Sequence, residues 1–313
     1  MSVIGIDLGG TKLASAVFDN AGKILNRSTA SLNGKKGREV GGLIVDETNK
    51  LLSSHEGIQS IGICIPGIYY AGTGCVWAPN IPGWENYPLL DEVRQSVDGK
   101  EMKVSIDSDR ACYILGETWQ GSAQGSTDAV FLAVGTGIGA GILCEGRIIR
   151  GHGDIAGALG WMGLQRPFRE AYKKCGCFEY NASGEGLVKV AREMLVKEKE
   201  YSGPLGDKDP ELLTTREIFA AYEKQDCVAT FVIDEAIAYW GMAIANIVST
   251  FNPEKIILGG GVFGPATKFI DRISEEARKW AQPISMKQVS IAVSSLGGDA
   301  GLVGAGRLAL MNS

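Results

Sequence analysis

The chain opens with three short runs of mainly apolar, β-type residues. They cover residues 2–7, 12–19 and 23–30, and the breaks between them contain GG and DNAGK. Runs of this length, bounded by glycine turns, predict β-strands, and such short breaks predict that consecutive strands pair antiparallel. The sequence therefore predicts an antiparallel three-stranded meander at its start.

Helical and strand patterns alternate after this meander. Apolar residues at Val40, Leu43, Ile44 and Leu51 fall on roughly one face of a helix. The pattern then predicts, in order, the strand SIGICIPG, an irregular segment rich in Gly, Pro and Trp over 68–88, a short helix near 89–97, the strand KVSID and a helix over about 109–120. The predicted order of the first half is βββαβαβα.

The second half repeats this order. DAVFLAVGTGIGAGILCEGRIIRG predicts three short strands with glycine turns, a mostly helical insertion covers about 166–250, and KIILGGG, a helix over 265–282, VSIAVSS and a last helix follow. Two copies of one order predict an α/β protein with duplicated domains that face each other across a cleft. We place the N-terminal domain at 1–118 plus 298–313, and the C-terminal domain with its helical insertion at 119–297.

Composition narrows the class of protein. Glycine accounts for 43 of 313 residues, about twice its ordinary usage of roughly 7%, so we expect glycine loops to carry function. The formal net charge is −5 and no basic cluster stands out, which argues against a nucleic-acid partner.

The cysteines and the N-terminus indicate the compartment. Most of the seven cysteines lie in apolar runs, which favours buried free thiols in a reducing compartment. MSVIGIDLGG lacks the basic region and long apolar stretch of a signal peptide, and no uninterrupted apolar run reaches eighteen residues. We therefore expect a cytoplasmic protein without a membrane partner.

Three glycine loops are the main chemical signal: DLGGTK (7–12), GTGIGAG (135–141) and LGGGVFG (258–264). Each alone is equally consistent with an ordinary turn. Together they predict phosphate binding, because glycine lets backbone N–H groups approach phosphate oxygens. The expected ATP-binding residues of the two later loops are Gly135, Thr136, Gly137, Gly259, Gly260 and Gly261.

The first loop adds charged and polar side chains. Asp7 at the end of a strand is suited to hold Mg²⁺ through water, and Lys12 adds a cation nearby. Gly9, Gly10 and Thr11 offer amides and a hydroxyl to the terminal phosphates. The structural alternative is a hairpin with a solvated lysine.

A dinucleotide-binding protein is a competing interpretation. GGGVFG fits G-x-G-x-x-G between a strand and a helix, as in a Rossmann unit. The acidic residue that such a unit places at the end of its second strand is missing, because VSIAVSS ends in Ser294 and Ser295. GTGIGA is followed by β-type residues instead of a helix. Both facts argue against a dehydrogenase.

The motifs taken in order resemble the ROK (repressor, open reading frame, kinase) sugar kinases. The segments that carry the resemblance are GIDLGGTKLASAVFD, IGICIPGIYYAGTGCVWAPNIPGWENYPL, FLAVGTGIGAGIL, GCFEYNASG, IILGGGVF and AGLVGAGRLAL. The resemblance implies the actin/hexokinase/Hsp70 (ASKHA) fold with two RNase H-like domains. The first predicted strand begins at residue 2, without the preceding helix-turn-helix of ROK repressors, so the kinase branch is implied.

The resemblance also implies a catalytic base and a sugar site. DSDRA before LGE is similar to the family's E-N-D-A-N segment, which makes Asp109 the base and puts Ser108 where an asparagine usually helps to hold the sugar. The structural alternative for Asp109 is a helix N-cap. Glu179 in GCFEYNASG matches a sugar-binding glutamate. Gly67 and Asn80 match segments that border the sugar, and Trp84 beside them is either another sugar contact or a core residue.

The zinc motif of the family is largely missing. The family usually has A-G-E-x-G-H and C-x-C-G-x-x-G-C-x-E, whereas this chain has AGALGWM and EAYKKCGCFE. Ala158 stands in place of a sugar-binding glutamate, Trp161 in place of the histidine ligand, and only Cys177 of the three cysteines matches. Cys175, Cys177 and His152 do not form a recognised four-ligand spacing, so we expect no structural zinc. Trp161 either stacks on a sugar ring or fills the space of the missing histidine.

These observations predict an ATP- and Mg²⁺-dependent kinase that phosphorylates a hydroxyl of a hexose, as a glucokinase does. Two alternatives stay open: a kinase for an N-acetylamino sugar or an unusual hexose, and a sugar-binding kinase homologue without turnover. The identity of the sugar and the pathway do not follow from the sequence. The resemblance implies a homodimer.

Overall fold

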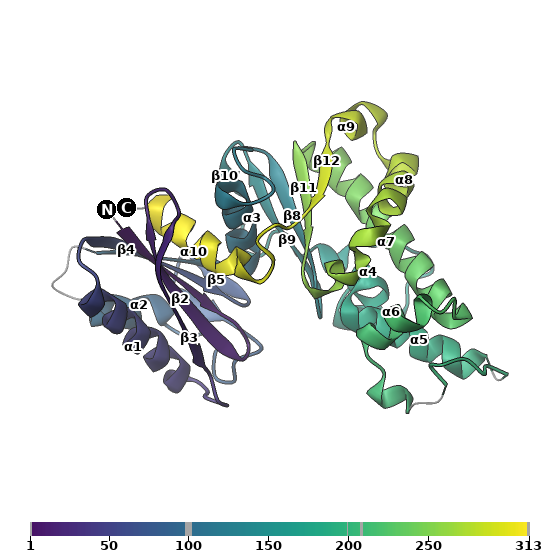
Figure 1. Cartoon of the computed structure of the whole chain (residues 1–313), viewed down its shortest axis with the longest axis horizontal. Helices are drawn as coiled ribbons and strands as arrows, with labels where there is room; N and C mark the ends of the chain where they lie inside the picture. The colour runs from purple at the N-terminus through teal and green to yellow at the C-terminus, as the bar shows by residue number, and fades with distance from the viewer. Residues whose placement is uncertain (1, 98–101, 199, 207–208, 312–313) are drawn as a thin grey trace. The chain divides into compact units, whose positions relative to one another are not determined.

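The computed structural model describes residues 2–97, 102–198, 200–206 and 209–311 (Figure 1). The chain forms two compact units. Unit 1 consists of Met1–Ala129, Gly141–Gly157 and Ser294–Ser313, and unit 2 of Val130–Ala140 and Ala158–Val293. The domain boundaries expected from the sequence, at 118 and 298, stay a prediction.

A five-stranded sheet forms the centre of unit 1, in the order β3-β2-β1-β4-β7. Its strands are β1 (Ser2–Leu8), β2 (Lys12–Asp19), β3 (Ile24–Ser31), β4 (Ile58–Ile65) and β7 (Lys103–Ser108). The first three pair antiparallel, which confirms the predicted meander. β4 runs parallel to β1 and to β7, so the carboxyl ends of these three strands share one edge.

Two helices cover each face of this sheet (Figure 1). α1 (Arg38–Ser54) and α2 (Leu89–Ser96) pack on one face, and α3 (Asp109–Gln120) and α10 (Ala300–Met311) on the other. The alternation along β1 explains this arrangement, because neighbouring side chains of a strand point to opposite faces. Ile4 and Ile6 belong to the core under α1, and Val3 packs against α10.

Glycines let α10 approach the sheet and α3 closely. A Cβ on Gly62 of β4 would lie 2.0 Å from the carbonyl oxygen of Ala305, and one on Gly304 would lie 1.8 Å from that of Cys112. Neither position has room for a side chain. This close packing brings the first turn of α10 to the end of β1.

The segment over 68–88 is more regular than its sequence indicated. It contains an antiparallel hairpin of β5 (Ile68–Tyr70) and β6 (Cys75–Trp77). Strands of three residues are too short to show a periodic pattern, and the glycine and proline content masked them. The expectation of an irregular segment was therefore wrong for this hairpin.

The second five-stranded sheet has the order β10-β9-β8-β11-β12. Its strands are β8 (Ala129–Val134), β9 (Ile138–Cys144), β10 (Arg147–Ile148), β11 (Lys255–Gly259) and β12 (Ser290–Val293). β11 and β12 are parallel, as β4 and β7 are in the first sheet. The same strand order in both sheets confirms the predicted duplication.

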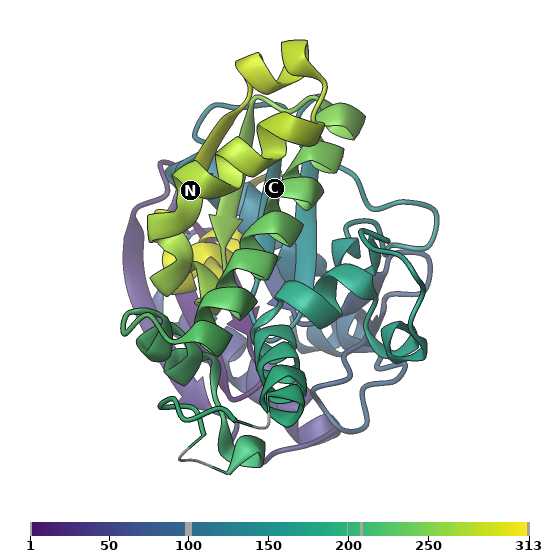
Figure 2. The same cartoon turned by 90° about the vertical axis from the view of Figure 1, so that its right-hand side faces the viewer.

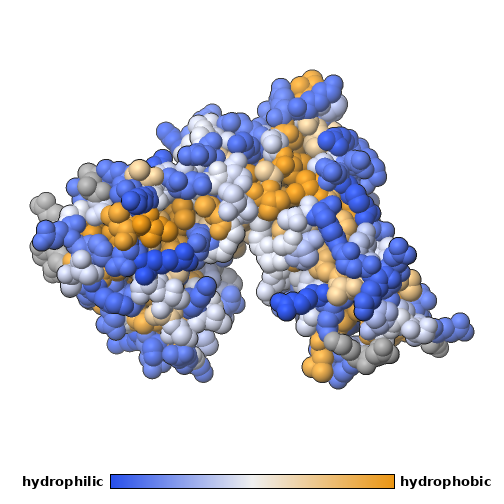
Figure 3. Space-filling view, viewed as in Figure 1, coloured by the Kyte–Doolittle hydropathy of each residue, from blue (hydrophilic) through white to orange (hydrophobic). Residues whose placement is uncertain are grey.

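Unit 2 is rich in helices. They are α4 (Cys177–Ala182), α5 (Gly184–Lys197), α6 (Thr215–Tyr222), α7 (Cys227–Phe251), α8 (Ile270–Trp280) and α9 (Pro283–Gln288). The single helix expected over 265–282 is instead the 3₁₀ turn Pro265–Phe269 followed by α8, and α9 begins at Pro283. α8 is amphipathic, with Ile273 and Ala277 buried and a hydrophilic outer face (Figure 3).

The long helix α7 is a core helix of unit 2 (Figure 2). Among the described residues, it is the one helix that is long and apolar enough to cross a membrane, but 61% of its most apolar window is buried inside the protein. α4, α5, α6 and α8 all pack against it. Its apolar composition is therefore explained by packing within the unit.

Candidate functional site

Carboxylates gather where three parallel strands of unit 1 end. Asp7 of β1 is level with Cys64 of β4, which is level with Asp107 of β7. Asp109 is the first residue of α3, two positions beyond Asp107. The negative charge of Asp7 affects the ionisation of Asp109, so the structure brings these two predicted site residues together.

Asp109 has the properties of a general base. Burial raises its pKa to about 6, and the neighbouring charge of Asp7 adds to the rise. The Arg110 cation, the Arg110 N–H at 2.8 Å from Oδ1 and the Tyr113 hydroxyl oppose it. A carboxylate with this pKa is mostly ionised at neutral pH and is a stronger base than an exposed aspartate.

Asp7 lies against the start of α10. Burial raises its pKa, while a hydrogen bond from the Cys64 thiol and the charge of Lys12 oppose the rise. A Cβ added to Gly301 in the first turn of α10 would come within 2.8 Å of both Asp7 carboxylate oxygens. Glycine at 301 thus leaves room for this carboxylate at the strand end.

Ser108 caps α3. It is 8% exposed, and its hydroxyl accepts a hydrogen bond from the Ala111 N–H at 3.4 Å. The cap alternative for Asp109 was therefore wrong, because the capping residue is Ser108. Whether Ser108 also contacts a sugar stays a prediction.

One charged pair was missed by the sequence analysis. Asp107 is buried, and its Oδ2 accepts a hydrogen bond from Arg150 Nε at 2.9 Å and a second one from Arg150 Nη2. Burial raises the pKa of Asp107, and Arg150 opposes that rise. The only signal in the sequence was an acidic residue at the end of a strand, and nothing marked Arg150 as its partner.

The β1–β2 loop lines a cavity of about 430 Å³ in unit 1. Gly10, Thr11 and Asn80 all border it. A Cβ on Gly10 would meet nothing within 4 Å, whereas Gly9 donates its N–H to the Lys12 carbonyl at 2.9 Å and closes the turn. The structure thus joins part of the predicted phosphate loop with one predicted sugar residue. Lys12 itself is exposed.

Gly67 and Trp84 have different roles. Gly67 has φ +124. Its carbonyl oxygen accepts a hydrogen bond from Arg110 Nη2 at 3.5 Å, and Arg110 directly follows Asp109 in the chain. Trp84 is 1% exposed, stacks on Tyr87 at 4.5 Å and donates its ring N–H to the Gly37 carbonyl. Trp84 is therefore a core residue, which was one of its two interpretations.

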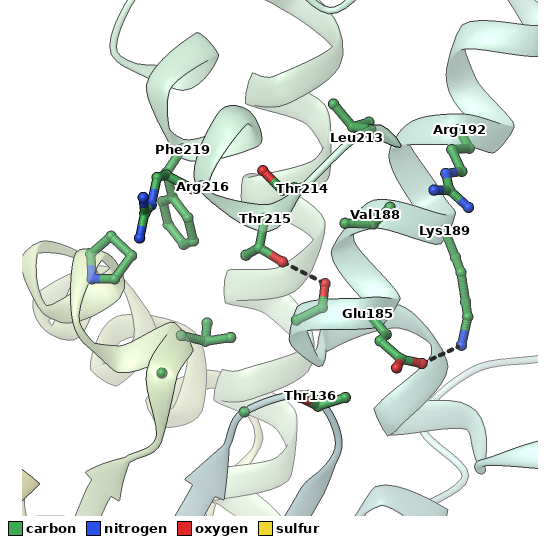
Figure 4. Close-up of a pocket in the computed structure, with 15 residues that line it drawn as sticks. Thr136, Glu185, Val188, Lys189, Arg192, Leu213, Thr214, Thr215, Arg216 and Phe219 are labelled. Carbon is green, nitrogen blue, oxygen red and sulfur yellow. Dashed lines mark hydrogen bonds and ion pairs between the residues drawn. The ribbon is translucent and has the colours of Figure 1, made fainter. Parts of the chain in front are cut away.

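A cavity of about 970 Å³ lies in unit 2 (Figure 4). Gly135 and Thr136, the first half of α5, the start of α6, and Gly261, Val262 and Pro265 surround it. Its apolar lining comes from Val188, Leu213, Phe219, Val262 and Pro265. Lys189 and Arg192 lie along α5 on one side, and Arg216 projects from α6 on the other (Figure 4). No motif in the sequence marked these three cations.

The glycines around this cavity fall into two classes. A Cβ on Gly135 or Gly261 would meet nothing within 4 Å, so packing does not require glycine at either position. A Cβ on Gly259 would instead meet the Phe131 ring at 2.2 Å, and Gly260 has φ +90. Gly259 and Gly260 thus shape the turn, whereas Gly135 and Gly261 place no side chain at the cavity. The Gly135 N–H itself donates to the Gly137 carbonyl at 2.9 Å. A cavity with apolar walls and glycine backbone at its edge suits a ligand that has both a flat ring and an anionic group.

Glu179 of α4 contacts the glycine loop over 135–141, at Gly137 and Ile138. Its Oε2 accepts the Ile138 N–H at 2.6 Å, and a Cβ on Gly137 would lie 2.7 Å from that oxygen. Burial raises the pKa of Glu179, and the Ile138 N–H opposes the rise. Gly137 is therefore required by Glu179, although it belongs to a predicted phosphate loop.

The segment that replaces the family's zinc motif contains no metal cluster. Over 2–97, 102–198, 200–206 and 209–311, no three His, Cys, Asp or Glu side chains are grouped to hold a metal ion. Cys177 is buried and interacts with Asn181, Cys175 is partly exposed, and His152 is exposed. Trp161 is 58% exposed and fills no core space.

Comparison with known proteins places the chain in a family. The ROK family profile matches residues 3–312. The chain belongs to the ROK family. It is 32% identical to the glucokinase of Halalkalibacterium halodurans, over 97% of this chain and 94% of that protein.

Solved ROK structures show the same fold. The ROK hexokinase of Thermus thermophilus superposes with a TM-score of 0.80 at 27% identity, covering 100% of this chain and 99% of that one. The ROK glucokinase of Streptomyces griseus, solved with glucose and AMPPNP, superposes with a TM-score of 0.73 at 29% identity, covering 99% of this chain and 100% of that one. The expected fold, with duplicated α/β domains of the actin/hexokinase/Hsp70 type, is therefore confirmed.

Proposed function

We propose that this ROK protein phosphorylates a hydroxyl of a hexose with ATP, as a glucokinase does. The observation that carries the proposal is the pair Gly135 and Gly261, at which no packing contact excludes a side chain and yet none is present beside a large, partly apolar cavity. Glycines that packing does not require are expected where a phosphate chain approaches the backbone. The ROK glucokinase and hexokinase relatives support the same reaction.

The nucleotide occupies the unit 2 cavity in this proposal. Val188, Leu213 and Phe219 provide an apolar surface for the base, and the backbone N–H groups of Thr136 and Gly261 at the cavity lining hold phosphate oxygens. Asp7 fits a magnesium ion held through water, because it is a carboxylate at a strand end and Gly10 of the following turn leaves space beside it. When bound, magnesium neutralises phosphate charge.

Asp109 accepts the proton of the attacking hydroxyl. The hydroxyl oxygen forms a bond to the γ-phosphorus, the bond from that phosphorus to the bridging oxygen breaks, and ADP leaves. The raised pKa of Asp109 favours this proton transfer at neutral pH, because a base works best when its pKa lies near the working pH.

Glu179, Asn80, Gly67 and Ser108 are the proposed sugar residues. The Glu179 carboxylate accepts the backbone hydrogen bond from Ile138 and retains lone pairs for sugar hydroxyls. Ala158 offers no carboxylate, and the Ser108 hydroxyl is engaged in capping. Both observations favour a shifted sugar preference, such as an N-acetylamino sugar or an unusual hexose, as the second candidate.

A screen for ADP release over about twenty sugars tests the proposal. We expect turnover with at least one hexose or N-acetylamino sugar and none without sugar. Measurable sugar binding without turnover for any of them would instead support a kinase homologue that only binds. The cytoplasmic location, the homodimer and the lack of structural zinc stay proposals, and light scattering and metal analysis of the purified protein test the last two.

A further inference from the structure

We propose that Arg169, Tyr180 and Glu193 form a metal-free clasp that positions Glu179 in unit 2. The name clasp refers to these three residues throughout. The inference rests on the proposed function, because it takes Glu179 to bind the sugar. It adds three positioning residues that the family resemblance did not supply.

The three residues of the clasp meet at one carboxylate oxygen of Glu193. Glu193 Oε1 on α5 accepts a hydrogen bond from Arg169 Nη2 at 2.7 Å and another from the Tyr180 hydroxyl on α4. Burial opposes the ionisation of Glu193, but these two hydrogen bonds, together with the positive charges of Arg169 and Lys197, outweigh it and hold the pKa of Glu193 below its ordinary value. Glu193 thus ties the segment before α4 and α4 itself to α5.

Aromatic rings surround the Arg169 cation. Its guanidinium carbon lies 5.0 Å from the centre of the Tyr180 ring and 5.6 Å from that of Tyr172. The two rings meet edge to face at 5.4 Å. An isolated, partly exposed ion pair contributes little to stability, but a guanidinium held by a carboxylate and two rings is fixed in direction as well as in charge.

A second contact anchors the same segment. Gln165 Oε1 accepts the Tyr172 hydroxyl at 2.9 Å and the Tyr239 hydroxyl of α7 at 2.5 Å. Asn181 of α4 also reaches the Tyr172 hydroxyl, at 3.5 Å. The segment around 165–172 is therefore tied to α7 and α4 by these side chains, in addition to the backbone bond from the Gly176 N–H to the Tyr172 carbonyl at 2.7 Å.

α4 needs such support. It has six residues, too few to be stable from its own hydrogen bonds, so contacts on its sides must fix its direction. The clasp holds Tyr180, while the adjacent Glu179 meets Ile138, Gly137 and Gly160. A shift of α4 would move the Glu179 carboxylate by the same amount.

The clasp stands where the family resemblance implies a zinc site. Glu170 and Tyr172 replace two of the expected cysteines, and the side chains present do not fit zinc, because the buried thiol of Cys177 has Asn181 as its neighbour. Tyr172 instead packs against Arg169 and bonds Gln165. One of these two positions, Tyr172, thus supplies part of the support that replaces the metal.

The test compares Glu193→Ala and Glu193→Gln with the wild type in steady-state kinetics. We expect Glu193→Ala to raise the KM for the sugar by about tenfold or more, because a shift of about 1 Å in a positioning group has effects of that size. The KM for ATP should change by less than about twofold, since Glu193 is not among the residues that line the nucleotide cavity. Glu193→Gln keeps an acceptor for Tyr180 and should recover part of the loss.

Asp234→Ala is the matched control. It removes a surface ion pair with Arg272 at 2.9 Å, of similar exposure and also in unit 2, and should leave both KM values unchanged. Treatment with a chelator, followed by magnesium, should leave wild-type kinetics unchanged as well. Unchanged sugar KM in Glu193→Ala, or a zinc ion whose removal raises that KM, would overturn the clasp.

Hydrogen exchange separates failure of the clasp from failure of the proposed function. Amides over 159–183 should exchange faster in Glu193→Ala than in the wild type and in Asp234→Ala, whether or not the protein turns over sugar. A wild type without turnover but with this exchange pattern would refute the kinase and keep the clasp. Equal exchange in all three proteins would refute the clasp.

Discussion

The β1–β2 and β8–β9 hairpins occupy the same place in two sheets of one strand order, yet only the first carries charge. β1 ends with Asp7 before GGTK, and β8 ends with Val134 before GTGI. Beside the first hairpin lies Asp109 at the start of α3. Beside the second lie an open glycine and a large cavity.

This difference indicates that the two units, although they share one strand order, are suited to different parts of the chemistry. Carboxylates in unit 1 are suited to hold a metal and to accept a proton, whereas uncharged backbone in unit 2 is suited to hold phosphates. The comparison predicts that substitutions in unit 1 lower kcat, and that substitutions at the unit 2 cavity raise the KM for ATP. The predictions below test this division, beginning with the largest effect.

Asp109→Asn should produce the largest loss. We expect kcat to fall by roughly 10²- to 10⁴-fold, the range that general bases contribute, while the affinity for ATP stays near that of the wild type. Steady-state kinetics and nucleotide titration measure the two quantities. A variant with more than half of the wild-type kcat would remove Asp109 from its proposed role.

Glu179→Gln should affect the sugar more than the nucleotide. Removing a charged acceptor for a hydroxyl costs about 1.5–3 kcal/mol, which corresponds to a rise of about ten- to a hundredfold in the KM for the sugar. Initial rates at saturating ATP measure it. An equal rise in both KM values would indicate general disruption of unit 2 instead of a lost sugar contact.

Two glycines of one loop should behave differently. Gly135→Ala places a methyl group at the open cavity and should raise the KM for ATP by about tenfold. Gly137→Ala pushes against the Glu179 carboxylate and should raise mainly the KM for the sugar. Gly264→Ala is the control, because its φ is −74 and the nearest atom to an added Cβ is 3.5 Å away. Identical effects of the first two substitutions would contradict the division of this loop.

The pH profile should show the ionisation of Asp109. Since the base must be ionised, kcat/KM should fall as pH drops through about 6, the pKa that burial gives this carboxyl. Initial rates in buffers of constant ionic strength measure this acidic limb of the pH–rate profile. A limb that stays near the ordinary aspartate value of about 3.9 would show that the free enzyme does not raise this pKa.

The smallest expected effect is on stability. The pKa of Asp109 is higher in the folded than in the unfolded protein, so the folded state binds this proton more tightly. The free energy of unfolding therefore decreases as pH rises from about 4 to about 6. Asp109→Asn removes that cost at neutral pH. Its Tm there should equal or exceed that of the wild type, and thermal unfolding at neutral pH and about pH 4 checks this, with the difference absent at the lower pH.

Much of the fold could be predicted from sequence because its signals are local. The meander, the parallel strands and most helices follow from periodicity and glycine turns, as in β1 and α1. The β5–β6 hairpin could not be predicted, because strands of three residues show no period. The division of 265–282 into a 3₁₀ turn and α8, with α9 starting just beyond it, depends on packing that no local pattern records.

The candidate site was predictable where motifs are contiguous. Asp7, Gly135 and Gly261 lie in glycine loops that the sequence displays. Arg150 and Arg169 act through partners far along the chain, Asp107 and Glu193, and only folding brings such pairs together. The distinction between Gly135 and Gly137 likewise depends on what each one faces.

The central claim is that Asp109 takes the proton of a hexose hydroxyl while that hydroxyl attacks the γ-phosphorus of ATP. The most direct test incubates wild type and Asp109→Asn with ATP, magnesium and the best sugar of the screen, and follows the sugar by mass spectrometry. We predict a hexose monophosphate with the wild type, formed in step with ADP, and almost none with the variant. ADP without a phosphorylated sugar, or equal product from both proteins, would contradict the account.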